Sequence, residues 1–142
     1  MQVSNKTIIV TVSGNGIGRE LTLLLLRKNA NVVGVDININ ALNETQKIAK
    51  VSDERFKGFA LDITDRAKVE ALPDEVLNHF KTLDGIINNA GIIQKFITVN
   101  EISIEDINRV MNVNFYGTVY LTKAFLPLFL ERPEAHIVNI SS

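Results

Sequence analysis

Three glycines near the N-terminus are spaced in a way that suits the binding of a phosphate group. Gly14, Gly16 and Gly18 follow a β-branched apolar run at residues 7–12 and open a segment of helical periodicity. Glycine lets the backbone turn sharply and approach a ligand closely, and the free N–H groups at the start of a helix bind pyrophosphate. Because many strand-to-helix turns carry glycine, this pattern alone leaves a phosphate site and an ordinary turn about equally open.

A carboxylate follows the next apolar run. Asp36 closes residues 32–35 and lies 20 residues after Gly16, which matches the separation expected for an acidic group that hydrogen-bonds an adenosine ribose. The alternative is a solvated strand end or a helix cap. Given the glycines upstream, ribose binding is favoured. A carboxylate repels the 2′-phosphate of NADP, and neither Asn15 nor Ile37 supplies a cation for it, so NAD is favoured over NADP.

The elements that must position these residues follow a regular alternation. The apolar runs that predict strands are residues 7–12, 32–35, 56–62, 83–88 and 135–140. The segments that predict helices are residues 17–29, 41–51, 67–80 and 103–132, and Pro73 is expected to kink the third or end its first half. This βαβαβαβαβ order predicts an α/β fold, a Rossmann-like doubly wound parallel sheet of five strands. Ligands of such sheets bind beyond the carboxyl ends of the strands.

Composition excludes several other classes of function. The 142 residues are 46% hydrophobic and 22% charged, and 15 Lys and Arg nearly balance 16 Asp and Glu. Without a block of Lys and Arg, no nucleic-acid partner is expected. The absence of cysteine excludes thiol catalysis and thiolate metal sites, and His79 and His136 stand too far apart in sequence to suggest a metal site.

Neither a membrane span nor an export signal is expected. The run at residues 7–12 is too short for the core of a signal peptide, and the apolar stretch at residues 115–130 is interrupted by polar residues, Gly117 and Pro127. A cytoplasmic location is therefore expected.

Five short motifs then occur in order. They are T-V-S-G-N-G-I-G at residues 11–18, D-I at 62–63, N-N-A-G at 88–91, N-V-N-F-Y-G at 112–117 and I-V-N-I-S-S at 137–142. Together they resemble the N-terminal part of the short-chain dehydrogenase/reductase (SDR) family, and the likeness covers the whole chain. Any one motif could arise by chance, whereas five in the right order make coincidence improbable.

The resemblance implies an NAD-dependent oxidoreductase that transfers a hydride between nicotinamide and a small-molecule alcohol or carbonyl substrate. It implies that the glycines hold the pyrophosphate, that residues 62–63 meet the adenine and that residues 88–91 line the far ribose. The catalytic residues it implies are Asn114 and Ser142. The cofactor-binding residues it implies are Thr11, Gly14, Asn15, Gly16, Ile17, Gly18, Asp36, Ile37, Asp62, Ile63, Asn88, Asn89, Ala90 and Gly91.

Simpler roles stay open for three of these positions. Asp62 can cap the helix that follows it, and Asn88 and Asn89 can satisfy backbone groups of their loop rather than contact a cofactor. Asn114 falls in the middle of a long helical segment, where asparagine is unfavourable by about 0.5 kcal/mol or more relative to alanine. We therefore expect a local backbone perturbation or a water site there.

Val12 departs from the family pattern, which has glycine directly after the threonine. A β-branched side chain resists a positive φ and adds bulk. Either the affinity for cofactor falls or the turn is remodelled.

The Tyr-x-x-x-Lys pair of the family is absent. The tyrosines are Tyr116 and Tyr120, and Lys123 lies three residues after the second. In the family, a tyrosinate whose pKa is lowered by the lysine moves the proton that accompanies the hydride, while the serine holds the substrate oxygen and the asparagine positions a relaying water. We therefore expect the chain to be a single NAD(P)-binding domain over residues 1–142, incomplete at its C-terminus, that binds a dinucleotide without turnover.

The sequence leaves two alternative functions to consider and favours a second copy of the chain as a partner. A non-catalytic dinucleotide-sensing or scaffold module is the main alternative. A phosphoacceptor domain is disfavoured, because residues 11–13 offer no carboxylate to hold Mg²⁺ beside Asp62. The wide apolar stripe of the helix at residues 103–132 favours a homo-oligomer formed through it, as in the family.

Overall fold

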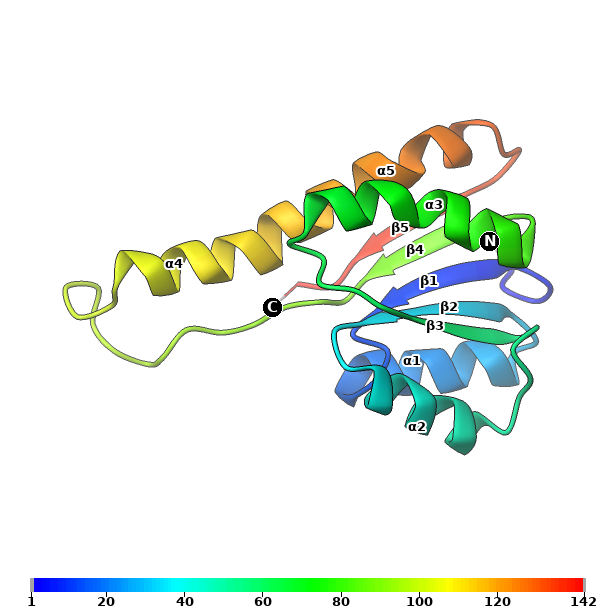
Figure 1. The fold of residues 1–142 in the computed structure, drawn as a ribbon, viewed down its shortest axis with the longest axis horizontal. Helices are drawn as coiled ribbons and strands as arrows, with labels where there is room; N and C mark the ends of the chain where they lie inside the picture. The colour runs from blue at the N-terminus through cyan, green and yellow to red at the C-terminus, as the bar shows by residue number, and fades with distance from the viewer. Residues whose placement is uncertain (1, 142) are drawn as a thin grey trace.

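The computed structural model describes residues 2–141. Its strands are β1 (Thr7–Thr11), β2 (Asn31–Asp36), β3 (Phe56–Ala60), β4 (Gly85–Asn88) and β5 (His136–Asn139). Its helices are α1 (Gly16–Arg27), α2 (Ile39–Ala49), α3 (Arg66–Phe80), α4 (Ile104–Met111), the π-helical segment η1 (Asn112–Gly117) and α5 (Thr118–Leu130). The strands form one parallel sheet in the order β3-β2-β1-β4-β5 (Figure 1). The predicted doubly wound α/β fold is confirmed.

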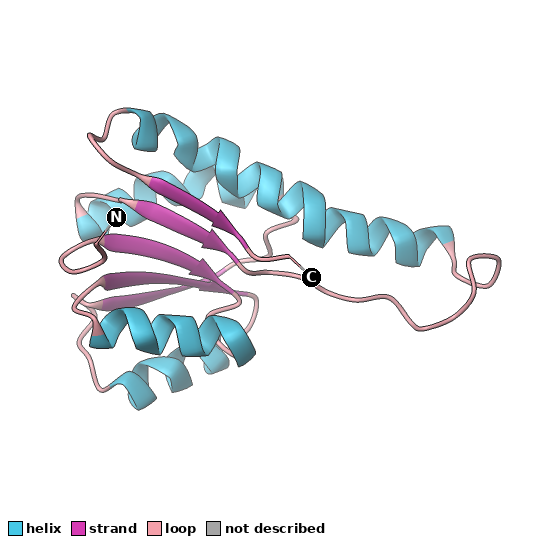
Figure 2. Cartoon of the chain, turned by 180° about the vertical axis from the view of Figure 1, so that it is seen from behind, coloured by secondary structure: helices cyan, strands magenta, loops and turns pink. Residues whose placement is uncertain are grey.

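Apolar residues on both faces explain why the sheet is covered by helices on both sides. On one face Ile8, Val10 and Val32 pack in a core cluster with residues of α1 and α2. On the other face Ile9 and Val33 pack in a second cluster with residues of α3 and α5. Side chains alternate between the faces of a strand, so a continuous apolar run fills both cores. Figure 2 shows the two helical layers on opposite sides of the sheet.

The long helical segment expected at residues 103–132 is divided in the structure. α4 and α5 are α-helical, and the six residues of η1 between them adopt π-helical geometry. A π-helical turn inside an α-helix is rare and often marks a functional position. The backbone perturbation expected at Asn114 is thus confirmed.

Of the two effects expected of Pro73, a kink or an end to the first half of its helix, the second is wrong. α3 continues through Pro73 to Phe80. An interior proline removes one hydrogen bond and disfavours a helix by about 3 kcal/mol. Val69, Leu72 and Val76, on both sides of the proline, are almost fully buried in the core. Burial of each such side chain contributes about 1.5–3 kcal/mol, which outweighs the effect of the proline.

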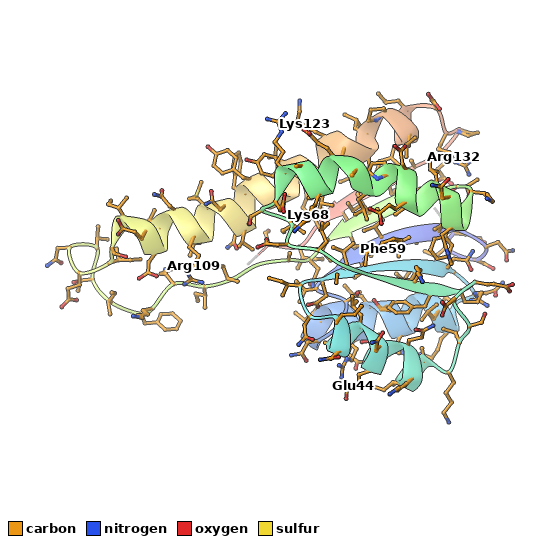
Figure 3. All side chains as sticks on the ribbon, viewed as in Figure 1. Glu44, Phe59, Lys68, Arg109, Lys123 and Arg132 are labelled. Carbon is orange, nitrogen blue, oxygen red and sulfur yellow. The ribbon has the colours of Figure 1, made fainter. Side chains whose placement is uncertain are left out.

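A buried carboxylate joins the amino ends of the strands. Asp84, directly before β4, is 1% exposed and accepts hydrogen bonds from the amide of Thr7 at 3.0 Å and from the guanidinium of Arg132 at 2.6 Å. Arg132 follows α5 and is labelled in Figure 3. Lys6 lies 3.5 Å from the same carboxylate. Burial by itself raises the pKa of Asp84, but the Thr7 amide, Arg132 and Lys6 together hold it below its usual value.

Among residues 2–141 no helix is long and apolar enough to cross a membrane. Within the same residues, no group of three His, Asp or Glu side chains is placed to hold a metal ion.

Candidate functional site

The turn between β1 and α1 depends on glycine at two positions for different reasons. Gly16 adopts a φ of 49°, and a Cβ on it would meet no atom within 4 Å, so the space above the turn is open. A Cβ on Gly18 would lie 2.1 Å from the carbonyl oxygen of Val12, so only glycine lets α1 pack this closely on the end of β1. Asn15 caps the helix through its side-chain oxygen, which accepts from the Gly16 amide at 2.8 Å. The Gly16 amide is thus already bonded within the chain, while the next amides of the first turn have no partner inside the helix.

Asp36 faces this turn. One of its carboxylate oxygens accepts a hydrogen bond from the Gly14 amide at 3.0 Å, and the other accepts from the Asn38 amide at 3.0 Å. A Cβ on Gly14 would lie 2.8 Å from the Asp36 carboxylate and 2.7 Å from the Cβ of Ala41, so glycine permits the contact. A carboxylate has about four acceptor sites, so these two bonds leave capacity for further donors.

Thr11 connects the end of β1 to the loop after β4. Its hydroxyl oxygen accepts hydrogen bonds from the amides of Asn89 at 2.9 Å and Ala90 at 2.8 Å, and the Asn89 side chain donates to the Thr11 carbonyl at 3.0 Å. The side chain of Asn89 thus satisfies a backbone group, as the simpler interpretation of the sequence allowed. The bonds hold residues 89–91 beside the glycine turn.

Val12 takes an unusual conformation for its type. Its φ is 55°, in the left-handed region that β-branched residues avoid, and its side chain is 37% exposed. The amide of Ser13 donates to the carbonyl of Val35 on β2 at 3.3 Å. The turn thus has a backbone shape suited to glycine although a valine occupies it.

Asn88 belongs to a polar group between β4, β5 and α5. Its side-chain amide donates to the Asn139 side chain at 2.8 Å and to the Thr122 hydroxyl at 3.3 Å, and Asn88 pairs with Asn139 in the register of β4 and β5. Asn88 is 3% exposed. Its side chain therefore joins the carboxyl end of β5 to the centre of the sheet.

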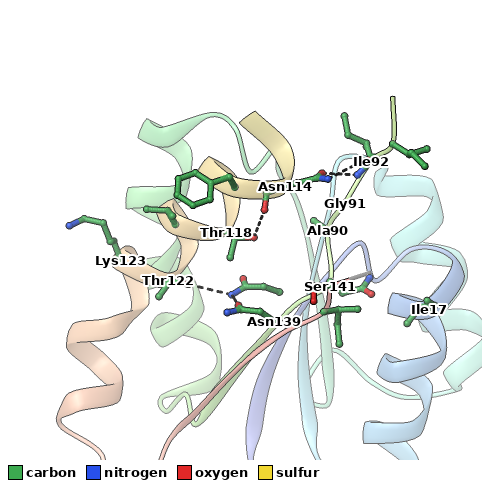
Figure 4. A pocket seen from close by; sticks show the side chains of 16 residues that line it. Ile17, Ala90, Gly91, Ile92, Asn114, Thr118, Thr122, Lys123, Asn139 and Ser141 are labelled. Carbon is green, nitrogen blue, oxygen red and sulfur yellow. Dashed lines mark hydrogen bonds between the residues drawn. The ribbon is translucent and has the colours of Figure 1, made fainter. Parts of the chain in front are cut away.

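Asn114, in η1, is bound to the loop after β4. Its side chain accepts from the amide of Ile92 at 2.8 Å and donates to the carbonyl of Ile92 at 2.9 Å (Figure 4). Both ends of the side-chain amide are thus satisfied by one residue of backbone. The structure assigns this side chain to positioning the loop.

The structure places Asp62 and Ile63 in different environments. Asp62 is exposed and accepts from the amide and hydroxyl of Thr64 at 2.9 and 2.8 Å. It does not cap α3, because Asp65 is the capping residue. Ile63 is 8% exposed and belongs to the core, where a Cβ on Gly117 would lie 2.6 Å from its Cδ1 atom. Glycine at the end of η1 makes room for Ile63.

A cavity of about 840 Å³ lies at the carboxyl ends of β4 and β5 (Figure 4). Its walls include Asn88, the loop from Asn89 to Ile93, Asn114 and Ser141, with Ile17 of α1 on the opposite side. Lys123 is the charged residue among the described lining residues. Ser142, the expected catalytic serine, lies outside the described residues. Asp36 and Ile37 do not line this cavity, and Asp62 lines a separate pocket with residues of α4 and η1, so the predicted site residues do not share one cavity.

Sequence reasoning missed the residues of α1 and α2 that support the glycine turn. Arg19 donates through Nε to the Gly14 carbonyl at 2.9 Å and pairs with Glu44 at 2.7 Å. Thr45, fully buried, donates its hydroxyl to the Ser13 carbonyl at 3.0 Å. No motif marks these residues, because the contacts of Arg19 with Glu44 and of Thr45 with Ser13 join segments more than 20 positions apart. Residue type and spacing give no signal that would have found them.

Comparison with known proteins agrees with this geometry. The family model of short chain dehydrogenases matches residues 6–142. SadH of Mycobacterium tuberculosis is 39% identical over 137 residues, which cover 96% of this chain and 49% of that protein. This chain spans about half the length of the curated relatives it matches.

Solved structures show the same arrangement. A short chain dehydrogenase/reductase from Burkholderia phymatum, in complex with NAD, matches with a TM-score of 0.93 at 29% identity. The match includes 100% of this chain and 50% of the Burkholderia chain. ElxO with NADP bound has a TM-score of 0.89 at 27% identity, over 97% of this chain and 56% of that one. The chain therefore belongs to the short-chain dehydrogenase/reductase family and corresponds to its N-terminal part.

Proposed function

We propose that this chain is the NAD-binding part of an oxidoreductase that acts on an alcohol or carbonyl compound. The observation that carries the proposal is the joining of Asp36 to the glycine turn through the Gly14 amide, beside open space at Gly16. A carboxylate at this place accepts the two hydroxyls of an adenosine ribose and repels a 2′-phosphate. NAD is therefore proposed ahead of NADP.

The residues present fit a dinucleotide. The amides that open α1 suit a pyrophosphate, and the exposed Asp62 beside the core residue Ile63 is proposed to meet the adenine. Asn88, Ala90 and Gly91 line one side of the cavity, where the second ribose and the nicotinamide are proposed to lie. The dinucleotide supplies a hydride donor or acceptor at that end.

We propose that the chain as given binds the cofactor without turnover. Transfer of a hydride to or from a carbinol carbon requires a group that moves the accompanying proton. The sequence has no Tyr-x-x-x-Lys pair for this step. Asn114 contributes by holding the loop at Ile92, and Ser142 is proposed to hold the substrate oxygen.

Titration of the purified chain with NADH, followed by nucleotide fluorescence, tests the proposal. We expect saturable binding of NADH. Asp36→Asn should weaken it about tenfold, because one charge-assisted acceptor is lost. The same variant should bind NADPH equally well or better, because the charge that repels the 2′-phosphate is gone. Asp53→Asn, which changes an exposed carboxylate in the loop before β3, is the control and should bind NADH as the unchanged chain does. No binding at millimolar NADH would overturn the proposal.

A non-catalytic dinucleotide-sensing or scaffold module is the second candidate, favoured by Val12 and by the missing Tyr-x-x-x-Lys pair. The two candidate functions are distinguished by fusing the chain to the C-terminal half of a relative that carries the Tyr-x-x-x-Lys pair. Turnover of an alcohol substrate by the fusion supports the oxidoreductase, whereas NADH binding without turnover supports the module.

We also propose that two copies associate through α4, η1 and α5. α4 projects beyond the sheet and buries none of its residues (Figure 1). Ile104, Ile107, Met111 and Phe115 form an exposed apolar stripe along it, with exposures of 65%, 38%, 44% and 53%. We expect Ile107→Glu to shift the chain to a monomer in light-scattering chromatography. A dimer that persists in this variant would overturn the proposal.

A further inference from the structure

A ligand that reaches both regions of the site must cross the end of β1. Asp36 ends β2, Ala90 and Gly91 follow β4, and β1 lies between those two strands in the sheet. The last residue of β1, Thr11, is 1% exposed, because its hydroxyl is bound to the loop after β4. The first exposed residue on this path is therefore Val12.

The surroundings of Val12 prevent its backbone from turning away. Its carbonyl oxygen lies under Gly18, where even a single added carbon would come within 2.1 Å. The residues on each side are bonded to neighbouring segments, Thr11 to Asn89 in the loop after β4 and Ser13 to the carbonyl of Val35 on β2. The φ of 55° is thus imposed by packing on both sides, and the side chain stays 37% exposed.

We propose that Val12 determines how tightly this chain holds its dinucleotide, by placing a branched side chain between the diphosphate and the end of β1. The proposal rests on the proposed function. The isopropyl group prevents the close approach of the ligand to the backbone that glycine permits. A dinucleotide bound from Asp36 to Gly91 must arch over it, which weakens the contacts to the amides of the glycine turn. The chain thereby binds the cofactor weakly and releases it readily.

Three variants at one position separate side-chain volume from backbone strain. Val12→Gly removes both the side-chain volume and the strain. Val12→Asn keeps a comparable volume but relieves the strain, because asparagine tolerates a positive φ. Val12→Ala removes most of the volume. Lys50→Gly is the matched control. Lys50 also has a left-handed φ, of 54°, but it caps the C-terminus of α2, in the connection that leads to the start of β3.

NADH titration and thermal unfolding are measured for each protein. We expect Val12→Gly and Val12→Ala to bind NADH about tenfold more tightly, the effect typical of relieving an overpacked contact. Val12→Asn and Lys50→Gly are expected to raise the unfolding temperature with little change in affinity.

The outcomes distinguish the inference from the function on which it rests. Equal affinity of Val12→Gly and the unchanged chain, both measurable, would overturn the role of Val12 and leave NAD binding in place. Equal gains in Val12→Gly and Val12→Asn would show that strain rather than volume controls affinity, which also overturns it. No binding by any of the proteins at millimolar NADH would overturn both the function and the inference.

Discussion

A side chain at position 18 would collide with the backbone of Val12, whereas one at position 16 would enter open space. Gly18→Ala should therefore lower the free energy of unfolding by about 3 kcal/mol, because α1 or the end of β1 must shift. Gly16→Ala should lower it by about 1–2 kcal/mol, through its φ of 49° alone. Urea unfolding of both variants measures the difference. Equal losses would show that the packing of α1 on Val12 is not tight.

Residues whose roles depend on their neighbours in sequence are predicted better than residues whose roles depend on contacts with distant segments. The glycines of residues 14–18 and Asp36 were identified because spacing alone relates them to a turn and a strand end. Arg19 and Thr45 were missed, since their partners Glu44 and Ser13 become neighbours only when α1 and α2 pack. The tertiary contacts of Asn114 with Ile92 could not be predicted from the sequence either.

At the scale of elements, η1 holds the loop after β4 through one side chain. Asn114→Ala removes both hydrogen bonds to the backbone of Ile92. We expect amide hydrogen exchange at Ile92 and its neighbours to increase at least tenfold, while the stability of the whole chain falls by no more than about 1 kcal/mol because the site is exposed. Asn114→Asp keeps the acceptor and should give a smaller increase. Unchanged exchange in the alanine variant would contradict this role.

The strands were predicted within two residues because each contains a short apolar run, which is buried in β1 and β2 and largely exposed in β5. The division of residues 103–132 was anticipated only as a perturbation at Asn114. Its π-helical form could not be predicted from the residue types, and the packing of Ile63 against Gly117 at its end joins segments more than 50 positions apart. The sequence left both a kink and an end of the helix open at Pro73, because the effect of the proline was weighed without the core contacts of Val69 and Val76.

At the scale of the whole molecule, Asp84 makes stability depend on pH. Its pKa in the folded chain is lower than the value of about 3.9 expected in the unfolded chain, so its contribution is complete above about pH 5 and is lost as the pH falls below 4. Asp84→Asn should lower the free energy of unfolding by about 2 kcal/mol at pH 7, because Arg132 and Lys6 lose their buried partner. Urea unfolding at pH 7 and pH 3.5 should show the difference shrinking at the lower pH. A difference independent of pH would contradict the ionised role of Asp84.

The position of β1 in the middle of the sheet has a consequence for the order in which the protein is made. β1 is synthesised first, and its partner on one side, β2, follows soon, but Ile8 pairs on the other side with Gly85. At about 5–20 residues per second, a ribosome needs roughly 4–15 s to deliver that second partner. During this interval the nascent chain presents the open backbone of β1 to its surroundings, so chaperone contact early in translation is expected to concentrate on residues 7–11.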